Sequence, residues 1–387
     1  MVKIIYDSEI EGHHTEYITH LIRYITNDEN DEERYIFLVP EEMQYKFPEI
    51  IKLADNCDNI KWEFISNLQC TFLKALPLYK RSFKELALVN SYADKFEAKE
   101  VFLLYFNIFQ LALIFKRPLF DIKGILFLQF YRMQKNTIFQ RLKYYRKYWI
   151  TKLYCYNSKI KTVFVLNDDK TVDFLNNRFK TRKFKMLSDP IPIYQEEKTY
   201  DVFKHYNIPR NKKILLHPGA IDPRKGTYEI IEAVDLLKDK ETDEFAILIV
   251  GKAKADIENV IKEKLSTLKN NEFTIIFDNT FVSNECLKSL LVQCYAVLMP
   301  YKNVEASSGI LGHAAINNKR VLAPDSGLIG EIIKKYKLGI LIDKPTALCI
   351  ASGIKNLHKF DNNEASAAEF VSGHTADIFS DSMLNFK

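Results

Sequence analysis

The sequence lacks the motifs that mark several large enzyme classes. No GxGxxG follows a predicted strand, so a nicotinamide-dinucleotide site is unsupported, and no GxxxxGK[ST] is present. The stretch from Gly219 to Thr227 contains Lys-Gly in that order, the reverse of a Walker loop. HExxH and GxSxG are absent as well. These absences remove the commonest zinc-protease, hydrolase and P-loop interpretations.

Cysteine pairs and long apolar runs are also missing. The six cysteines are scattered without a CxxC, which gives neither a zinc signature nor a disulfide scaffold and favours reduced thiols in the cytoplasm. Asp7 and Glu9 stand where a signal peptide would need an apolar run. The longest apolar stretch, 101–115, is interrupted by Asn107 and Gln110 and is shorter than the roughly 20 residues of a membrane span. It predicts a buried helix instead.

Glycine is scarce and unevenly distributed. The chain has 12 glycines in 387 residues, about 3% against a usual 7%. Ten of the 12 lie at or beyond Gly219. Glycine is needed where a backbone turns sharply or approaches a ligand closely, so we expect a phosphate-binding site in the second half of the chain.

Strands and helices alternate along the chain, whose length suits two domains. We expect first-half strands at 2–6, 35–39, 60–65, 122–130 and 162–166, and helices at 15–26, 68–90, 94–115 and 135–153. After a break at 188–192, strands at 213–217, 245–250, 273–277, 296–299 and 320–323 alternate with helices. The pattern predicts two doubly wound α/β domains, 1–189 and 190–365, with a C-terminal helix at about 366–387 packing back on the first.

Acidic residues are absent between Asp121 and Asp168, where ten basic residues occur. The net charge of +5 is therefore a local property, because the rest of the chain carries −5. Within 135–153 an apolar stripe recurs at helical spacing and predicts a core face, which leaves the cations on an exposed face. The stripe consists of Ile138, Leu142, Tyr145, Trp149 and Leu153. Segment 122–167 therefore suits a plain solvated surface or an anionic membrane or acceptor. Its eleven aromatic residues would also suit stacking on nucleic acid, but their helical spacing favours core packing over that partner.

Two segments of the second half place ligand-binding groups after strands. His217–Gly226 brings a loop, two cations and a glycine to the carboxyl end of a strand, where α/β sheets bind ligands. In 300–315, Ser307, Ser308 and Gly309 open a helix whose N–H groups and hydroxyls suit a phosphate. Glu305 precedes this helix and His313 lies within it.

At this pair of segments the chain resembles a retaining GT-B glycosyltransferase of the family-4 type (glycosyltransferase group 1). Lys225-Gly226 matches the family's first loop, and Glu305-Ala-Ser-Ser-Gly matches the start of its Glu-x7-Glu element. Four further segments are similar to the corresponding segments of the family: 281–285, 319–331, the loop 11–17 after the first strand, and 187–190 at the domain boundary. The resemblance is strong over about 213–343 and weak over 35–160. It implies two Rossmann-like domains facing across a cleft, with a sugar moved from a nucleotide-sugar to an acceptor hydroxyl with retention.

The resemblance also implies roles for particular residues. Lys225 and Glu305 are expected to be catalytic, and Gly12, His13 and His14 to line the acceptor side. No metal or resident cofactor is expected; the co-substrate is a UDP- or GDP-sugar and the acceptor a carbohydrate or lipid-linked glycan, in polysaccharide or glycoconjugate synthesis. The protein is expected in the cytoplasm, with a possible peripheral position on the inner face of the membrane. The expected donor-binding residues are Gly219, Arg224, Lys225, Val282, Glu305, Ser307, Ser308, Gly309, Ile310 and His313.

The chain departs from the family pattern at two positions. His313 replaces the second glutamate, which usually holds the ribose hydroxyls, although an imidazole can also hydrogen-bond a hydroxyl. The arginine usual beside the diphosphate is missing, since Gly219-Ala220 stands there, and Arg224 is a candidate to substitute for it. These departures keep an alternative open, a non-catalytic GT-B-like binding or scaffold protein.

Overall fold

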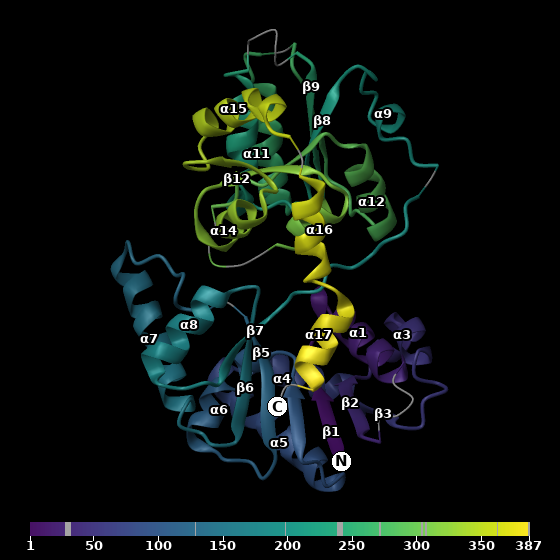
Figure 1. Cartoon of the computed structure of the whole chain (residues 1–387), viewed down its shortest axis with the longest axis vertical. Coiled ribbons are helices and arrows are strands. Elements are labelled where there is room, and N and C mark those ends of the chain that lie inside the picture. Colours follow the sequence, from purple (N-terminus) through teal and green to yellow (C-terminus); the bar gives the residue numbers. More distant parts are fainter. Residues whose placement is uncertain are drawn as a thin grey trace. The chain divides into compact units, whose positions relative to one another are not determined.

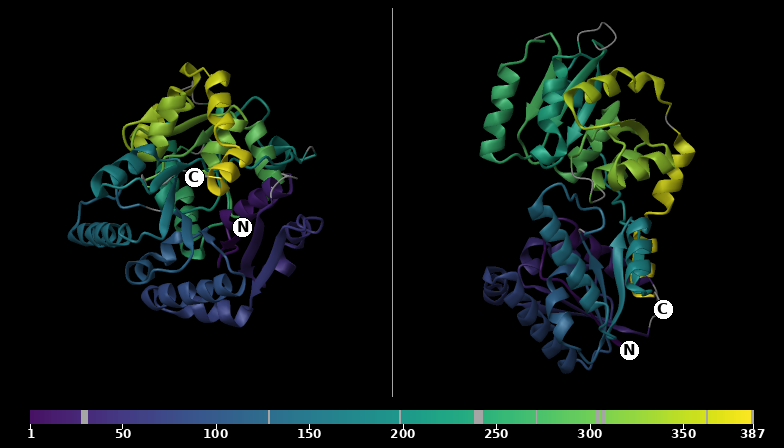
Figure 2. Two further views of the ribbon diagram at one scale, coloured as in Figure 1. Left: turned by 60° about the horizontal axis from the view of Figure 1, so that its bottom comes forward. Right: turned by 90° about the vertical axis from the view of Figure 1, so that its left-hand side faces the viewer.

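The computed structural model describes residues 1–27, 32–127, 129–197, 199–237, 243–270, 272–302, 305, 308–361 and 363–385. They form two compact units. Unit 1 comprises Met1–Pro190 and Thr375–Lys387, and unit 2 comprises Ile191–His374. Each unit has one parallel sheet with helices on both of its faces (Figures 1 and 2).

Unit 1 contains a seven-stranded sheet in the order β3-β2-β1-β4-β5-β6-β7. Its strands are β1 (Val2–Tyr6), β2 (Arg34–Pro40), β3 (Ile60–Ile65), β4 (Glu100–Leu103), β5 (Asp121–Leu126), β6 (Ile160–Leu166) and β7 (Phe184–Leu187). Its helices are α1 (His13–Asn27), α2 (Met43–Lys46), α3 (Pro48–Lys52), α4 (Asn67–Ala75), α5 (Leu78–Lys95), η1 (Phe106–Ile108), α6 (Gln110–Phe115), α7 (Ile138–Tyr154), α8 (Asp169–Phe179) and α17 (Ala376–Leu384).

Unit 2 contains a six-stranded sheet in the order β10-β9-β8-β11-β12-β13. Its strands are β8 (Lys213–Pro218), β9 (Phe245–Val250), β10 (Thr274–Asp278), β11 (Ala296–Leu298), β12 (Arg320–Pro324) and β13 (Gly339–Ile342). Its helices are α9 (Val202–His205), η2 (Pro223–Lys225), α10 (Thr227–Val234), α11 (Ala255–Ser266), α12 (Asn284–Gln293), α13 (Gly309–Ile316), α14 (Gly327–Tyr336), α15 (Ala347–Lys355), η4 (Leu357–Lys359) and α16 (Glu364–Ser372). The two doubly wound α/β units confirm the predicted fold class.

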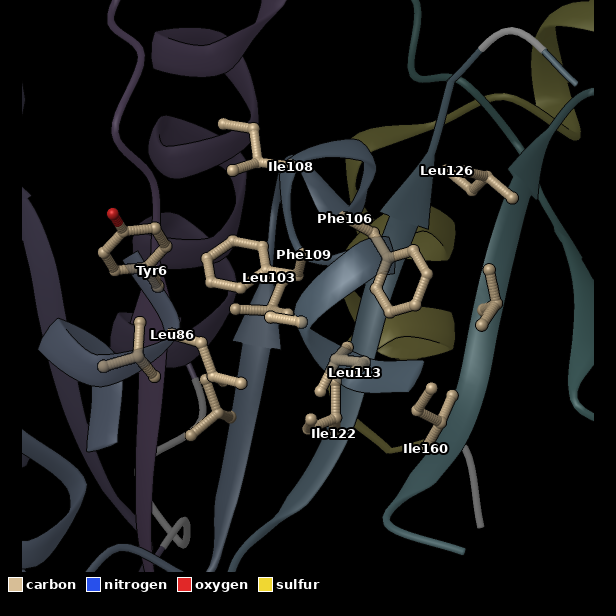
Figure 3. Close-up of a cluster of buried hydrophobic side chains, with 14 of the residues drawn as sticks. Tyr6, Leu86, Leu103, Phe106, Ile108, Phe109, Leu113, Ile122, Leu126 and Ile160 are labelled. Atoms are coloured by element: carbon tan, nitrogen blue, oxygen red, sulfur yellow. The ribbon is translucent and has the colours of Figure 1, made fainter. Parts of the chain in front are cut away.

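The core of unit 1 explains why its strands read as continuous apolar runs. Both faces of the sheet are covered, so successive residues of β1 pack into different apolar clusters. Ile4 and Tyr6 belong to the cluster on one face, and Ile5 belongs to the cluster on the other face. On the face drawn in Figure 3 the ring of Tyr6 meets Phe109 edge to face at 5.5 Å. Phe106 meets Tyr154 of α7 in the same way at 5.3 Å. The sheet and its helices are thereby fixed around aromatic contacts.

The C-terminal segment contains two helices rather than the single one expected at about 366–387. α16 packs in unit 2 against α13 and α14, and the chain then crosses to α17, which packs on α1 of unit 1. The ring of Phe379 stacks on Tyr17 at 4.8 Å, and the Tyr24 hydroxyl donates to Asp381 at 2.8 Å. Unit 2 consequently extends to His374, nine residues beyond the expected end at 365.

The helix predicted over 94–115 is wrong. Residues 100–103 form β4, the strand that pairs with β1 and β5 at the centre of the sheet. The α-helical parts of the span are its first two residues, which end α5, and 110–115, which is α6. A short apolar run suits a buried strand and a buried helix equally well, so its period cannot decide between them. The helix predicted over 68–90 is two helices, separated at Pro77. No helix in the described part of the chain is long and apolar enough to cross a membrane.

The prediction that the 138–153 stripe is core is also wrong. α7 forms as expected and begins with a capping box between Thr137 and Gln140. Its buried side, however, carries Tyr144, Tyr148 and Thr151, whereas the predicted stripe is exposed on the other side. The helix has two apolar faces, and helical spacing alone cannot say which of them packs on the protein.

Candidate functional site

The strand order of unit 2 identifies where a ligand would bind. The order reverses between β8 and β11, because the chain runs from β8 through β9 to β10 on one side and from β11 through β12 to β13 on the other. The loops that leave the carboxyl ends of β8 and β11 therefore diverge and leave a crevice, which is the usual ligand site of doubly wound sheets. Residues 219–226 follow β8 and residues 299–308 follow β11, so both predicted segments lie at this switch point.

Three predicted donor-site residues converge there. Gly219 follows β8 with φ at 93°, and a methyl group placed on it would lie 3.3 Å from Nζ of Lys225 and 3.9 Å from Cδ1 of Ile310. The Lys225 ammonium thus lies directly over the Gly219 backbone, with the first turn of α13 beside it. Among the described residues no carboxylate pairs with Lys225, and burial lowers the pKa of its ammonium. A partly desolvated cation without a counter-ion is a group that favours an anionic ligand.

Backbone geometry requires the glycine of the Lys-Gly pair. Gly226 has φ at 78°, and a methyl group on it would lie 2.2 Å from the carbonyl oxygen of Pro300. The Lys302 N–H donates to the Arg224 carbonyl at 2.8 Å, and the Lys302 ammonium pairs with Glu229 at 2.6 Å. The loop after β8 therefore lies against the segment after β11, and only glycine permits so close an approach.

His217, which the sequence placed next to the site without a role, fixes the start of α10. It is fully buried in β8; Nδ1 donates to the Leu298 carbonyl at 2.8 Å, so Nε2 accepts from the Thr227 hydroxyl at 3.0 Å. Burial, with a smaller contribution from the charge of Lys225, lowers the pKa of His217 to about 4. The neutral imidazole thus joins β8, β11 and the first residue of α10, which holds Lys225 in register.

Arg224 is the predicted donor residue that the structure pairs elsewhere. Its guanidinium forms a fork with Asp222, at 2.9 Å from Nε and 3.0 Å from the second nitrogen, and the side chain is exposed. Asp222 also accepts from the Arg224 N–H and so caps η2. Arg224 stabilises the shape of the loop, while Lys225 is the cation beside Gly219.

The helix that follows β11 has an open N-terminus and a covered middle. Ser308 is its N-cap residue without a side-chain cap bond, and Gly309 and Ile310 form its first turn. Its later residues pack inward: Ile191 would clash with any side chain at Gly312, and the buried His313 imidazole stacks on the ring of Tyr194 at 4.8 Å. Glu305 is half-buried, and Ser307 lies outside the described residues.

Val282 lies further along the same sheet edge, in the loop after β10. It is half-buried against the core of unit 2, next to Ser283, whose hydroxyl caps α12 by accepting from the Cys286 N–H at 3.1 Å. The switch point lies two strands away, since β9 stands between β10 and β8. Val282 is therefore not among the predicted residues that converge at the switch point.

Unit 1 has its own switch point, between β1 and β4, and His14 lies there. Nδ1 of His14 donates to the buried carboxylate of Asp7 at 2.7 Å. Burial opposes charging of His14, but Asp7 outweighs it and raises the pKa of the imidazole. The His14 ring also meets Tyr105 at 5.7 Å and Phe127 at 6.1 Å. The loops after β1, β4 and β5 thus come together around His14.

The other two predicted acceptor residues adjoin this group. Gly12 precedes α1 with φ at 66° and open space around it. His13 is exposed, and the hydrogen bond from its Nδ1 to Glu16 at 3.2 Å raises the pKa of its imidazole. Of the three, His14 is the one whose side chain is built into the switch point.

Sequence reasoning missed the ionic network beneath the loop after β1. The fully buried Glu85 of α5 accepts from the Tyr6 hydroxyl at 2.7 Å and from Ser8 at 3.1 Å, and it pairs with Arg81 at 2.5 Å. Arg81 also bonds Glu9 at 2.8 Å. A polar position on the inner side of an amphipathic helix was the available signal, but its partners Tyr6 and Ser8 are more than 70 residues away in sequence. Within the described residues, no cluster of three or more His, Cys, Asp or Glu side chains is arranged to hold a metal ion.

The two Rossmann-like units, each with a switch-point site, define the GT-B fold. Residues 200–369 match the family model described as "Glycosyl transferases group 1", which confirms the resemblance to that group for unit 2. The chain is similar to a glycosyltransferase crystal structure from Rickettsia africae (TM-score 0.68, 16% identity, 99% of this chain and 96% of that one).

Two further solved structures share the fold. One is WaaG, described as a glycosyltransferase involved in lipopolysaccharide biosynthesis (TM-score 0.62, 13% identity, covering 99% and 100%). The other is Anabaena HepE in complex with UDP (TM-score 0.64, 13% identity, covering 99% and 98%). At these identities the structures establish the fold. No curated protein matches the sequence.

Proposed function

We propose that the protein transfers a sugar from a UDP- or GDP-sugar to an acceptor hydroxyl with retention of anomeric configuration. The observation that carries the proposal is the Lys225 ammonium, which lies over Gly219 at the switch point of unit 2 without a carboxylate partner among the described residues. The family match over the same unit supports it. The loop is shaped for an anion at the place where this fold binds ligands.

In this proposal the chemical difficulty is the diphosphate that leaves the donor sugar. Lys225 stabilises the growing negative charge, and the N–H groups of Gly309 and Ile310 at the start of α13 add to it. The stabilisation is effective because Lys225 is held by its loop and needs no rearrangement as the bond breaks. The positive charge comes from this side chain and the helix terminus rather than from a metal. Glu305 orients the donor sugar.

We assign the acceptor to unit 1, where His14 is oriented by Asp7. An imidazole whose Nδ1 is held by a carboxylate presents Nε2 toward a hydroxyl in a fixed orientation. A carbohydrate or lipid-linked glycan would supply that hydroxyl, in polysaccharide or glycoconjugate synthesis. The six unpaired cysteines suit a reducing compartment, and we propose the cytoplasm.

The decisive experiment is a transfer assay with a panel of UDP- and GDP-sugars, with and without glycan and lipid-linked acceptors. For the donor that reacts, Lys225→Ala should lower kcat/KM by roughly 10²- to 10³-fold, as loss of one transition-state donor does. Lys264→Ala is the matched control, because this lysine pairs with Glu232 away from the switch point, and it should be neutral. Full activity of Lys225→Ala would refute the assignment.

A binding or scaffold protein is the second candidate, and two observations favour it. Arg224 is engaged with Asp222, and His313 is stacked under Tyr194, so both departures from the family pattern leave fewer groups for the nucleotide. This candidate predicts that neither UDP nor GDP raises the melting temperature and that no donor of the panel is consumed. Turnover of any donor would exclude it.

A further inference from the structure

α7 of unit 1 presents an apolar face that none of the described residues of unit 1 covers. Its packed side inserts Tyr144 and Tyr148 against Phe130, at ring distances of 5.2 and 5.7 Å, and Tyr148 also meets Phe179 of α8. In Figure 1 the helix lies at the left-hand border of unit 1, beside α6 and α8. The helix is therefore firmly mounted by one face, and another face is free.

The free face is a continuous apolar stripe. At about 100° per residue, the spacings of 4, 3, 4 and 4 place its members in one row, centred about 120° around the helix from Tyr144 and Tyr148. Single exposed apolar residues are normal on protein surfaces, but a row along a whole helix is not. The exposed fractions are 78% for Ile138, 64% for Leu142, 58% for Tyr145, 52% for Trp149 and 45% for Leu153.

Basic side chains border this stripe on both sides. By the same helical geometry Arg141 and Lys152 lie along one edge and Lys143 and Arg146 along the other. None of these four pairs with a carboxylate anywhere in the part of the chain that the structure describes. With no acidic residue between 121 and 168, nothing on the helix weakens their field. An apolar row with aromatic rings between basic edges is the pattern of a helix that lies in a membrane interface.

We propose that this α7 face, the stripe Ile138, Leu142, Tyr145, Trp149 and Leu153 with its four bordering cations, docks unit 1 on an anionic lipid surface. The helix lies parallel to the membrane plane, its apolar row enters the boundary of headgroups and acyl chains, and the cations contact lipid phosphates. Lys152 lies 4.8 Å from the ring centroid of Trp149, and their closeness suits the interface, where both side chains combine an apolar body with a polar end.

Charge and shape select lipid over the other occupants. A second copy docked through the same face would bring its own basic edges against these, with no acidic residue to compensate. A nucleic acid would satisfy the cations but leave the aliphatic side chains of Ile138, Leu142 and Leu153 without an apolar partner. A lipid interface is the one occupant that offers both negative charge and hydrocarbon.

The docking surface is preformed. The capping box of Thr137 and Gln140 holds the first turn of α7, and the preceding segment is fixed by a buried pair between Arg132 and Asp168 at 2.6 Å. No folding on binding is needed, so binding loses little conformational entropy. The inference does not depend on sugar transfer, and it can fail or hold separately.

The test is co-flotation of the full chain with vesicles of phosphatidylcholine alone or with a quarter phosphatidylglycerol, without any nucleotide-sugar. The chain should float with anionic vesicles at low salt, and roughly tenfold less with neutral ones or at high salt. The double variant Leu142→Ser, Trp149→Ser should lose roughly tenfold or more of the partitioning. Leu68→Ser with Leu119→Ser, exposed apolar positions of unit 1 outside α7, is the matched control and should float like the parent.

Three outcomes would overturn the proposal. The first is no flotation with anionic vesicles at low salt. The second is equal loss of flotation in the control and the α7 variants. The third is a dimer, or a complex with a single-stranded oligonucleotide, that forms without vesicle binding and is abolished by the α7 variant. An unchanged melting curve of each variant, expected because all four side chains are exposed, shows that the comparison is between folded proteins.

Discussion

The Lys-Gly loop permits a quantitative comparison of two glycines in one unit. Gly219 and Gly226 both have positive φ, at 93° and 78°, so alanine at either position is strained by about 1–2 kcal/mol. They differ in what a methyl group would meet. At Gly219 it meets the flexible end of Lys225 at 3.3 Å, whereas at Gly226 it meets the Pro300 carbonyl oxygen at 2.2 Å. Only the second contact is with backbone that cannot rotate away.

We therefore expect Gly226→Ala to destabilise unit 2 by the strain plus an overpacking term of about 1–3 kcal/mol, so by about 2–5 kcal/mol in all. Gly219→Ala should destabilise it by about 1–2 kcal/mol. At about 2–4 °C per kcal/mol for a unit of this size, the melting temperatures should fall by roughly 10 °C and roughly 5 °C. Gly219→Ala should nevertheless weaken UDP binding more than its small stability loss suggests, because its methyl group displaces the Lys225 ammonium.

The assay can separate the two units. The only two tryptophans, Trp62 and Trp149, are both in unit 1, so tryptophan fluorescence reports the melting of unit 1 and far-UV circular dichroism adds that of unit 2. The fluorescence transition should stay in place in both variants. If the melting temperature of unit 2 fell equally in the two variants, or fell more in Gly219→Ala than in Gly226→Ala, Pro300 would not be what confines the loop.

The remaining predictions concern the partly buried His14, the buried His217 and the buried pair of Arg132 with Asp168. Asp7 raises the pKa of His14, so the pair stabilises unit 1 fully below the unfolded-state pKa of about 6.5, and this contribution is lost as the pH rises through the folded-state pKa. His14→Gln should therefore flatten the pH dependence of the stability of unit 1 above pH 6.5, measured by tryptophan fluorescence. An unchanged pH dependence would contradict the pairing. His217 is buried neutral with its pKa at about 4, so unit 2 should lose about 3 kcal/mol as the pH falls from 6.5 to 4, and His217→Gln should remove that slope in circular dichroism melts. Arg132→Ala leaves the buried Asp168 unpaired and should lower the free energy of unfolding of unit 1, measured in urea, by about 3 kcal/mol. Lys61→Ala removes a pair of the exposed Lys61 with Glu63 and should lower it by at most about 1 kcal/mol. Similar losses would mean that burial does not strengthen the pair of Arg132 with Asp168.

How much of the candidate site could be read from the sequence differs between the two units. In unit 2 the site groups are contiguous, because each loop directly follows a strand and carries its own ligand groups, as Gly219 and Lys225 do. In unit 1 His14 was found by its place after the first strand, but the groups that orient it were not. Asp7 was noticed only as an acidic residue, and Tyr105 follows a strand that was predicted to be helix.

The sequence by itself determined the alternation of strands and helices, the two doubly wound units and the position of the loop around Lys225. These depend on local patterns, namely apolar periodicity, glycine placement and the order of residues after a strand. The tertiary structure alone decided which face of α7 packs, where β4 enters the sheet and that Lys225 lies over Gly219. Each of these depends on residues far apart in the chain, and for α7 both faces are apolar, so only the partner surface of Phe130 and Phe179 selects the buried one.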